Sequence, residues 1–404
     1  MKKQISVYKY LLAFIAVYFS CNSFVLAIKY GSNANLIMTV VTLVAFVVAL
    51  WKGKNKVPQQ TIVLMIAGIY NLLLTSLGTG YTNAYLLLVF NFLLAYAFIR
   101  LYTRQEFYEC YISIMKLLSI CAIVAGIINI IIPQLFSSVK IYVTGAGSHN
   151  NYYYDLLLAF QAVKNIRINS IWGEPGMFAV FLIFALILES FFVKRKIKLA
   201  NYIIFVVGII LTFSTTGYIC LILTVATLLL NNNQSHKRKG MLTWTLSLLI
   251  IGMIILERVP WFQEQLVSML GKLEEEDISF IGRAAPAFYN LKEGLRSPLW
   301  GHGLRGGKFY VEFLWFRGYL TCNTSTTTFL FASFGIILSG ITVWLMGKFA
   351  NQDKTLPYLV RILLFVIVIV NINTQAVHLD QIYWLLLFSV FMDPSKLQSI
   401  QEEI

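Results

Sequence analysis

The chain has few charged residues and few prolines for its length. Only 12% of its 404 residues are Asp, Glu, Lys or Arg, whereas 58% are hydrophobic, and it holds 8 prolines. Soluble domains carry about 25% charged residues, so this composition excludes a soluble globular protein. A membrane protein can expose apolar side chains to lipid instead. The composition therefore predicts a polytopic membrane protein that has the lipid bilayer as its surroundings.

Cysteine is also scarce and shows no pattern. The chain has 5 cysteines, an odd number, at Cys21, Cys110, Cys121, Cys220 and Cys322. Four of them lie within or beside apolar runs. This set predicts neither a disulfide framework nor a metal site, and we expect no metal and no other cofactor.

Acidic residues are fewer than basic ones, and the formal net charge is +14. The lysines and arginines are scattered over many short connectors rather than gathered on one domain. A nucleic-acid-binding domain concentrates its basic residues on one face, so we expect no nucleic-acid partner. The excess instead follows the rule that connectors on the cytoplasmic side are rich in Lys and Arg.

About 20 helical residues are needed to cross about 30 Å of hydrocarbon. Residues 201–230 are too long for one span, and basic clusters at 194–198 and 236–239 flank them on both sides. We therefore predict two short helices with a turn at 214–217. With these two, about twelve spans are expected. They lie near 10–28, 34–51, 61–78, 83–99, 111–132, 171–193, 241–256, 324–346, 356–373 and 381–392, with the two short helices within 201–230.

The basic connectors all fall on one side when these spans are threaded in order. The short turns at 79–82, 214–217 and 374–380, on the other side, carry no Lys or Arg. Both termini are then cytoplasmic, and two long loops, 133–170 and 257–323, face outward. The fold class expected is an all-α polytopic integral membrane protein, with one transmembrane domain over 1–404.

The first outer loop ends with Arg167 and Glu174-Pro175, where the chain enters the membrane again. Proline is well tolerated at the first position of a helix, which places Glu174 at or near the N-cap. Two interpretations stay open for Glu174. Its carboxylate either stabilises the helix N-terminus, or points with Arg167 into a shared outward cavity.

The second outer loop is the one long polar segment of the chain. An amphipathic helix is predicted from Pro260 to about Leu273, and a second helix from about Gly282 to Leu295. The outer side of the membrane should be poor in Lys and Arg, so a group of cationic side chains in this loop indicates an anionic ligand. These residues are Arg283, Arg296, His302, Arg305, Lys308 and Arg317.

Glycines follow the second predicted helix. Gly301-x-Gly303-x-x-Gly306 matches the dinucleotide-binding pattern by letter only, because no strand precedes it and no helix follows. We interpret it as a tight backbone that can approach a ligand closely.

These motifs, in this order and with this topology, resemble the Wzy-type polymerases of O-antigen and capsule repeat units, which are similar to the O-antigen ligase superfamily. The resemblance rests on Arg167-x-x-Ser170-x-x-x-Glu174-Pro175, Ser214-Thr215, Gly282-Arg283, Pro298-Leu299-x-Gly301-x-Gly303, and Asn323 before Phe334-Gly335-Ile336. It implies a fold similar to the glycosyltransferase C type. It also implies metal-free transfer of a glycan from undecaprenyl pyrophosphate to the non-reducing end of a lipid-linked repeat unit, at the outer face of a bacterial inner membrane.

The resemblance assigns roles to particular residues. Arg283 is the first choice for holding the pyrophosphate, followed by Arg167 and Arg305, with Lys308 and Asn323 nearby. Many ligase relatives have His-Asn where this chain has Cys322-Asn323, so either Glu174 or His302 is expected to be the base. A loop imidazole without a catalytic role is the alternative for His302. Additional candidates are Ser214, Thr215, His378 and Asp380.

Other functions stay open at this stage. A ligase or an O-linked oligosaccharyltransferase shares the same site but uses another acceptor. A repeat-unit flippase is expected to have charges inside its spans, whereas Lys116, Glu189 and Arg361 lie near predicted helix ends. A scaffold of an envelope complex needs neither Arg283 nor Glu174. For a polymerase, the resemblance implies undecaprenyl-pyrophosphate-linked oligosaccharides, a chain-length regulator and a flippase as partners.

Overall fold

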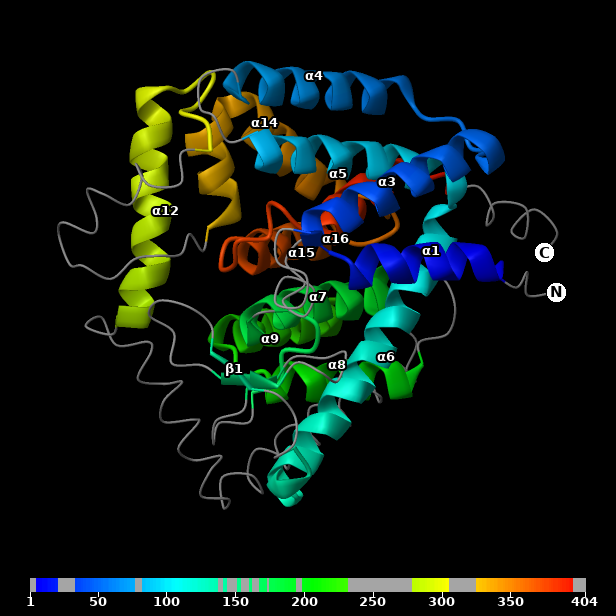
Figure 1. Cartoon of the computed structure of the whole chain (residues 1–404), viewed down its shortest axis with the longest axis vertical. Helices are drawn as coiled ribbons and strands as arrows, with labels where there is room; N and C mark the ends of the chain where they lie inside the picture. Colours follow the sequence, from blue (N-terminus) through cyan, green and yellow to red (C-terminus); the bar gives the residue numbers. More distant parts are fainter. Residues whose placement is uncertain are drawn as a thin grey trace.

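The structure is a computed structural model, and helices dominate it. It describes residues 5–20, 33–76, 82–136, 141–143, 151–153, 160–161, 167–172, 174–193, 198–231, 278–304 and 325–394. The helices of the first half are α1 (Val7–Tyr18), α3 (Asn33–Lys52), α4 (Gln59–Ser76), α5 (Thr82–Leu101) and α6 (Arg104–Ile131) (Figure 1). A 3-10 turn, η1 (Pro133–Phe136), follows α6.

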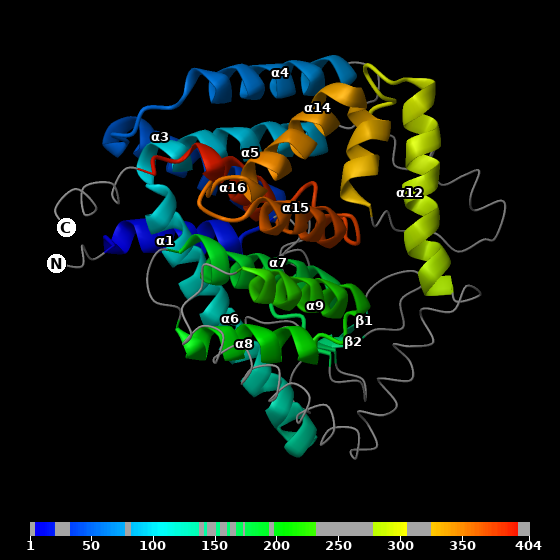
Figure 2. The same cartoon turned by 180° about the vertical axis from the view of Figure 1, so that it is seen from behind.

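The second half continues the bundle. Its helices are α7 (Pro175–Ile187), which runs on as a π-helical turn η2 (Leu188–Phe192), then α8 (Leu199–Leu211), α9 (Thr215–Leu230), α12 (Ile278–Arg296), α14 (Thr326–Ala350), α15 (Tyr358–Ile372) and α16 (Gln381–Phe388). The last described turn is the 3-10 segment η3 (Ser389–Phe391). Figure 2 shows from behind how α15 and α16 lie between an upper group of helices, α3 to α5, and a lower group, α7 to α9.

Helix α7 is the core of the bundle, and α4 belongs to its periphery. Every residue of α7 is buried, whereas α4 exposes Val63, Ile66 and Tyr70. A helix that is apolar all round must be surrounded, and α8, α9 and α6 pack against α7. The exposed apolar side of α4 needs lipid to cover it. The distribution of apolar side chains is therefore that of a membrane protein.

A helix lies at each predicted span that falls within the described residues. The two short helices predicted within 201–230 are α8 and α9, which are separated by Thr212 to Ser214. The predicted span at 241–256 lies outside the described residues. Among those described, four helices are long and apolar enough to cross a membrane, namely Gln59–Ser76, Arg104–Asn129, Pro175–Phe192 and Thr326–Ala350. The number of spans stays a prediction.

The predicted first outer loop contains a small antiparallel sheet. Strands β1 (Ile141–Val143), β2 (Asn151–Tyr153) and β3 (Phe160–Gln161) pair in the order β1-β2-β3. Ile141 pairs with Tyr153, and Tyr152 pairs with Gln161. The sheet lies near the start of α7 and the end of α8 (Figure 1).

Helix α14 is broken at Gly335. This residue has φ 68° and ψ −162°, a conformation that is almost restricted to glycine. The break leaves backbone groups of α14 without helical partners, and the segment after α12 satisfies them. His302 N donates to Ala332 O at 2.8 Å and Gly303 N to Ser333 O at 2.7 Å, while Ile336 N donates to Pro298 O at 2.7 Å. We call this set of three hydrogen bonds the interlock.

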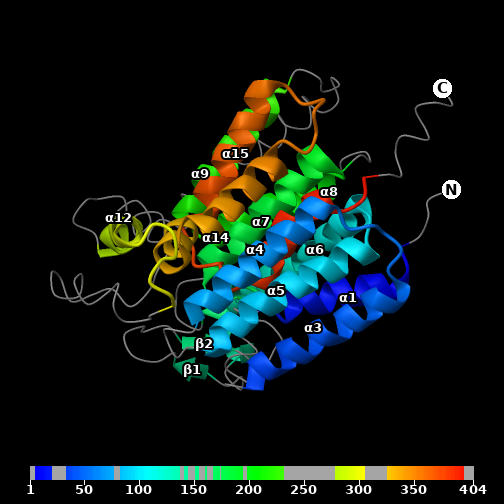
Figure 3. The same ribbon diagram turned by 90° about the horizontal axis from the view of Figure 1, so that it is seen from above.

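Helix α12 crosses the bundle at one end. Most helices run across the view of Figure 1, whereas α12 stands upright at one side. Figure 3, turned by 90°, shows α12 end-on beside α14. Its position agrees with the second helix that the sequence predicts from Gly282, while the predicted helix from Pro260 to Leu273 lies outside the described residues.

Candidate functional site

The starts of α7, α9 and α14 meet at one end of the bundle, which we call the site end. A Cβ on Gly217 in α9 would lie 3.0 Å from the Cβ of Ala179 in α7, so the first turns of these helices touch. A Cβ on Gly176 would lie 2.2 Å from Nε2 of Gln375, which belongs to the connector between α15 and α16. The amides of a helix N-terminus carry partial positive charge and favour anions. Several such termini at one end favour an anionic ligand there.

Arg167 adds a full positive charge at this end. Its Nε donates to Thr212 O at 3.0 Å and one Nη donates to Phe213 O at 3.1 Å. Ile168 N also donates to Leu211 O at 3.1 Å. Arg167 therefore caps the last carbonyls of α8 and holds its guanidinium at the turn that leads into α9. The sequence predicted Arg167 as a ligand-binding residue but gave no sign of this capping role.

The same two segments contain strained backbone. Ser170 has φ 53° and Phe213 has φ 47°, values that residues with a side chain rarely adopt. Such a conformation costs about 1–3 kcal/mol and persists only where the surroundings impose it. Here the hydrogen bonds from Arg167 and Ile168 fix the turn around Phe213. The α8–α9 turn is thus rigid and held by contacts from residues more than forty positions earlier.

Glu174 is the N-cap of α7 with Pro175 at the first helical position, as the sequence predicts. The Glu174 carbonyl accepts from Met177 N at 3.1 Å, but the side chain makes no capping hydrogen bond. Glu174 is exposed. Its carboxylate therefore lies at the site end without serving as a hydrogen-bonded cap of its own helix.

Ser214 and Thr215 lie at the start of α9, so the turn predicted at 214–217 comes slightly earlier and residues 215–217 are helical. Ser214 is the N-cap, and its Oγ accepts from Gly217 N at 3.3 Å. Both residues are buried. This capping bond engages the Ser214 side chain in the fold of the α8–α9 turn. Ser214 and Thr215 thus contribute to the site chiefly through the position of the helix N-terminus.

Three polar residues that sequence analysis did not single out fix the start of α14. Asn373 Oδ1 accepts from Thr327 N at 2.9 Å and from Ser325 Oγ at 3.1 Å. Thr326 Oγ1 donates to Gln375 O at 2.6 Å and accepts from Val377 N at 3.0 Å. The connector between α15 and α16 is thereby attached to α14. Polar residues between two apolar runs mark this region in the sequence. Their hydrogen-bond partners lie more than 40 positions away in the chain, so the sequence did not identify them.

His378 lies in this connector, buried against Phe329 of α14 at a centroid distance of 4.2 Å. Within the described part of the chain, its Nδ1 has no hydrogen-bond partner. Burial lowers the pKa of His378 from 6.5 to about 4. The imidazole is therefore neutral at pH 7.

Asp380 follows in the same connector as the N-cap of α16 and is fully buried. Its Oδ1 accepts from Ser20 Oγ at 2.8 Å, which ties the connector to the residues after α1. Asn91 Nδ2 donates to Leu379 O at 3.0 Å from α5. Irregular backbone within a membrane protein needs internal hydrogen-bond partners, and these side chains supply them.

His302, the other candidate base, lies in the segment that follows α12. Its Nε2 lies 3.0 Å from Glu293 O in the last turn of α12, and because a carbonyl only accepts, this nitrogen donates. The structure thus gives His302 a role in ending α12, whatever further role it has.

The glycines beside His302 pack against protein. A Cβ on Gly301 would lie 2.4 Å from Phe334 N. The sequence predicted close approach to a ligand, whereas the structure shows close approach to the backbone of α14.

The remaining predicted ligands divide into two groups. Arg283 lies within α12, in a part of the helix whose side chains are outside the description. Arg305, Lys308 and Asn323 lie outside the described residues altogether. The structure therefore places Arg167, Glu174, Ser214 and Thr215 at the site end, and the positions of the other cationic side chains stay predictions.

Glu189 belongs to the opposite end of α7, which we call the far end. The sequence placed it near a helix end within reach of water, but it is buried, at 1% exposure. Its carboxylate accepts from Lys198 N at 2.9 Å and from Asn201 Nδ2 at 3.2 Å. Glu189 thus caps the start of α8.

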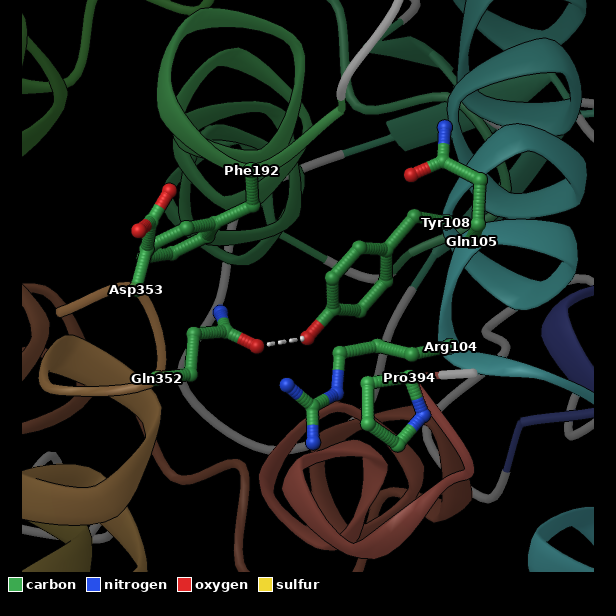
Figure 4. A pocket seen from close by; sticks show the side chains of 7 residues that line it. All are labelled: Arg104, Gln105, Tyr108, Phe192, Gln352, Asp353 and Pro394. Carbon is green, nitrogen blue, oxygen red and sulfur yellow. Dashed lines mark hydrogen bonds between the residues drawn. The ribbon is translucent and has the colours of Figure 1, made fainter. Parts of the chain in front are cut away.

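A cavity of about 120 Å³ also lies at the far end (Figure 4). Tyr108 of α6 crosses it and donates a 2.6 Å hydrogen bond to Gln352 Oε1. Arg104 borders it and donates to the carbonyls of Ser389, Val390 and Met392. The bonds of Arg104 join the start of α6 to the η3 turn and Met392, and the bond of Tyr108 joins α6 to the α14–α15 connector, so we interpret this region as structural.

Titratable metal ligands are not clustered in the described part of the chain. No group of three or more His, Cys, Asp or Glu residues there is placed to hold a metal ion. Cys110, Cys121 and Cys220 are free thiols. The expectation of metal-free chemistry stays a prediction for an experiment.

Apolar helices around a buried α7, with a cationic and strained turn at one end, define a polytopic membrane protein with a candidate anion site. The sequence model of the WcaD colanic acid polymerase family matches residues 11–268, which is more than half of the chain. The chain belongs to the WcaD colanic acid polymerase family. No curated protein is significantly similar to it.

Membership of a polymerase family implies a glycosyltransferase-like enzyme of polysaccharide biosynthesis, in agreement with the predicted class. The matched region includes Arg167, Glu174, Ser214 and Thr215. It ends before α12, so Arg283, His302 and the connector with His378 lie beyond it.

Proposed function

We propose that the protein polymerises oligosaccharide repeat units linked to undecaprenyl pyrophosphate, at the outer face of a bacterial inner membrane. In this proposal the site end faces outward and both termini are cytoplasmic. The family supports a polysaccharide polymerase. The observation that carries the proposal of a pyrophosphate-linked donor is Arg167 at the start of α9, beside the start of α7.

The proposed reaction forms one glycosidic bond and breaks one bond to phosphate. The hydroxyl of the acceptor sugar attacks the anomeric carbon of the donor glycan, and the pyrophosphate leaves with the electron pair of the C–O bond. The charge that develops on the leaving group is where a fixed positive site stabilises the transition state most. The guanidinium of Arg167 and the N-terminus of α9 supply such charge without rearrangement. Arg283 of α12 is proposed as a second phosphate ligand.

The acceptor hydroxyl must lose its proton as the bond forms. Glu174 is our first choice for the group that accepts it, because its exposed carboxylate is not engaged as a cap of α7. His302 is less suited, because its Nε2 donates to Glu293 O. We propose that the reaction needs no metal. The proton passes to Glu174, and the electron pair of the broken C–O bond passes to the pyrophosphate.

The alternatives within this framework differ in the acceptor or in the step. A ligase transfers the finished polymer to another acceptor, and a flippase only moves single repeat units across the membrane. A polymerase needs a flippase to deliver its substrate and a chain-length regulator to stop it, and we propose both as partners.

A gel of surface polysaccharide and of lipid-linked intermediates distinguishes these functions. Cells that lack the gene are complemented with wild type, with Arg283→Ala, or with Lys354→Ala as a control from the exposed α14–α15 connector. We expect single repeat units at the surface without a ladder in the deletion and in Arg283→Ala, and a normal ladder in Lys354→Ala. Long lipid-linked polymer that never reaches its acceptor means a ligase. Single units trapped on the cytoplasmic side mean a flippase, and either result overturns the proposal.

A further inference from the structure

Helix α12 presents an apolar face that no described segment covers. Phe288 and Leu295 are each 65% exposed, and Leu291 between them is 47% exposed. Residues three, four and seven positions apart share one face of a helix. The opposite face packs against α14 through Asn290 and Gly294, and a Cβ on Gly294 would lie 2.2 Å from the Phe331 ring. The exposed face is thus directed away from α14.

The apolar surface continues past the end of α12. Leu299 is 59% exposed and Trp300 is 45% exposed. Both lie in the segment whose backbone is fixed to α14 by the interlock, so their exposure is not that of a loose loop. Trp is enriched at the boundary between membrane and water, because its ring is apolar and its N–H is polar.

Cationic residues line one edge of the same face. Lys292 lies four positions after Phe288, and Arg296 four positions further. Lys292 lies over the Tyr289 ring, 5.8 Å from its centroid, and Arg296 pairs with Glu293 in a bond that leaves it 51% exposed. An apolar stripe with Lys and Arg beside it is the pattern of helices that lie in the membrane interface. Long cationic side chains there reach the lipid headgroups while their stems stay in apolar surroundings.

The placement of α12 fits the same surroundings. It runs across the other helices rather than along them (Figures 1 and 3) and contacts the first part of α14 at the site end. Helix α4 ends at this end as well, since Tyr85 bonds both Thr75 O of α4 and Leu304 N. The last turns of α4 expose Tyr70, Leu73 and Leu74. The apolar face of α12 therefore lies at the same end as a surface that lipid must cover.

We propose that α12 lies in the plane of the membrane at the site end, with Phe288, Leu291, Leu295, Leu299 and Trp300 among the acyl chains of that leaflet. The occupant of the face is the membrane itself, with its headgroups at Lys292 and Arg296. The interlock joins α12 to α14, so the lipid contact fixes the depth of both. This contact does not depend on the proposed enzymatic function. If that function holds as well, Arg283 of α12 is kept at the level where a lipid-linked pyrophosphate lies.

The test places nitroxide spin labels on single cysteines in a cysteine-free background, reconstituted in lipid nanodiscs. Labels at Phe288→Cys and Leu295→Cys are compared with Val63→Cys on α4, which has a matched exposure of 63%. Lys354→Cys in the exposed α14–α15 connector is the water control. Oxygen concentrates in lipid, whereas a nickel chelate stays in water.

We expect the ratio of oxygen to nickel accessibility at 288 and 295 to approach that at 63 and to exceed the ratio at 354 several-fold. A ratio equal to that at 354 means that the face is in water. Low accessibility to both reagents means that a protein segment or a second copy covers it. Either result overturns the proposal. A second measurement uses the unmodified protein, with lipids that carry a photoactivatable group on the acyl chain. Adducts on the peptide around 288–300 support the membrane contact, and adducts confined to spans such as α4 contradict it.

Discussion

Replacement of Gly335 by alanine removes the feature on which the join between α12 and α14 depends. Gly335 has φ 68°, and a Cβ there would lie 2.3 Å from Leu299 O and 2.7 Å from Trp300 N. Both neighbours are backbone atoms, which cannot turn aside as a flexible side chain does. The substitution therefore has to shift the segment before His302 or straighten α14, and both shifts break the interlock.

The loss of stability expected for Gly335→Ala has two contributions. An alanine in this region of backbone conformation costs about 1–3 kcal/mol. The three hydrogen bonds of the interlock are each worth about 0.5–1.5 kcal/mol. Together they predict a loss of about 2.5–7.5 kcal/mol. At about 2 °C per kcal/mol for a large chain, the midpoint of thermal unfolding falls by about 5–15 °C.

The assay is thermal unfolding of the purified protein in one detergent, followed by loss of the monodisperse chromatographic peak. Gly340→Ala is the matched control, because it makes the same change in the same helix and a Cβ there meets no atom within 4 Å. Alanine inside a helix is favoured over glycine by about 0.5–1 kcal/mol, so the control should be equal to wild type or slightly more stable. Equal midpoints for Gly335→Ala and Gly340→Ala would refute the interlock.

Four other outcomes are expected. Glu174→Gln should lower the transfer rate by about 100-fold or more. Its unfolding midpoint should stay within about 1 °C of wild type, because the carboxylate makes no capping hydrogen bond in α7. A change in stability without loss of activity would contradict the role of Glu174 as base. His378 is neutral in the fold because burial lowers its pKa from 6.5 to about 4, so the unfolded chain binds a proton at a higher pH than the folded chain does. The free energy of unfolding should therefore fall by about 3 kcal/mol as the pH drops from 6.5 to 4. If His378→Gln shows the same pH dependence, another group causes it. Arg283→Lys should fail nearly as badly as Arg283→Ala in the ladder assay, because lysine lacks the planar fork of arginine, and full activity would exclude a bidentate phosphate contact. EDTA should leave the activity of reconstituted protein unchanged, whereas strong inhibition reversed by a divalent cation would mean that the reaction needs a metal.

The helices of the bundle could be predicted because lipid imposes a simple rule on sequence. Apolar runs must be long enough to cross, and basic clusters mark the connectors on one side. This rule separated α8 from α9, although apolar residues run almost without interruption through both. A second local rule, that proline suits the first position of a helix, placed Glu174 at the N-cap of α7. Both features depend on residues close together in the chain.

The break in α14 could not be predicted in the same way. Gly335 stands within an apolar run, where glycine is common in membrane helices. Its conformation is set by Leu299 and Trp300, which approach from another segment. The glycine pattern around Gly301 was interpreted as a backbone that approaches a ligand, whereas in the structure the segment that Gly301 approaches is α14.

The contacts of the candidate site also could not be predicted, because they join residues far apart in the chain. Arg167 and Ser214 were predicted as site residues by resemblance, but the bond from Arg167 to the carbonyl of Phe213 spans 46 positions. Ser20 and Asp380 are 360 positions apart and still form a buried hydrogen bond. Such pairs become adjacent only through packing of the whole bundle. An isolated polar residue in an apolar stretch of sequence indicates that a hydrogen-bond partner exists, but it does not identify the partner.

We propose above all that this protein joins repeat units carried on a polyprenyl pyrophosphate. The most direct measurement uses the purified protein in proteoliposomes with undecaprenyl-pyrophosphate-linked repeat units as the only substrate, with product length read on a gel and released undecaprenyl pyrophosphate quantified. We expect a ladder of products and one released undecaprenyl pyrophosphate for each bond formed, with neither in Glu174→Gln. Intact substrate after incubation with active, folded wild-type protein, or a ladder without release of the lipid pyrophosphate, would contradict the claim.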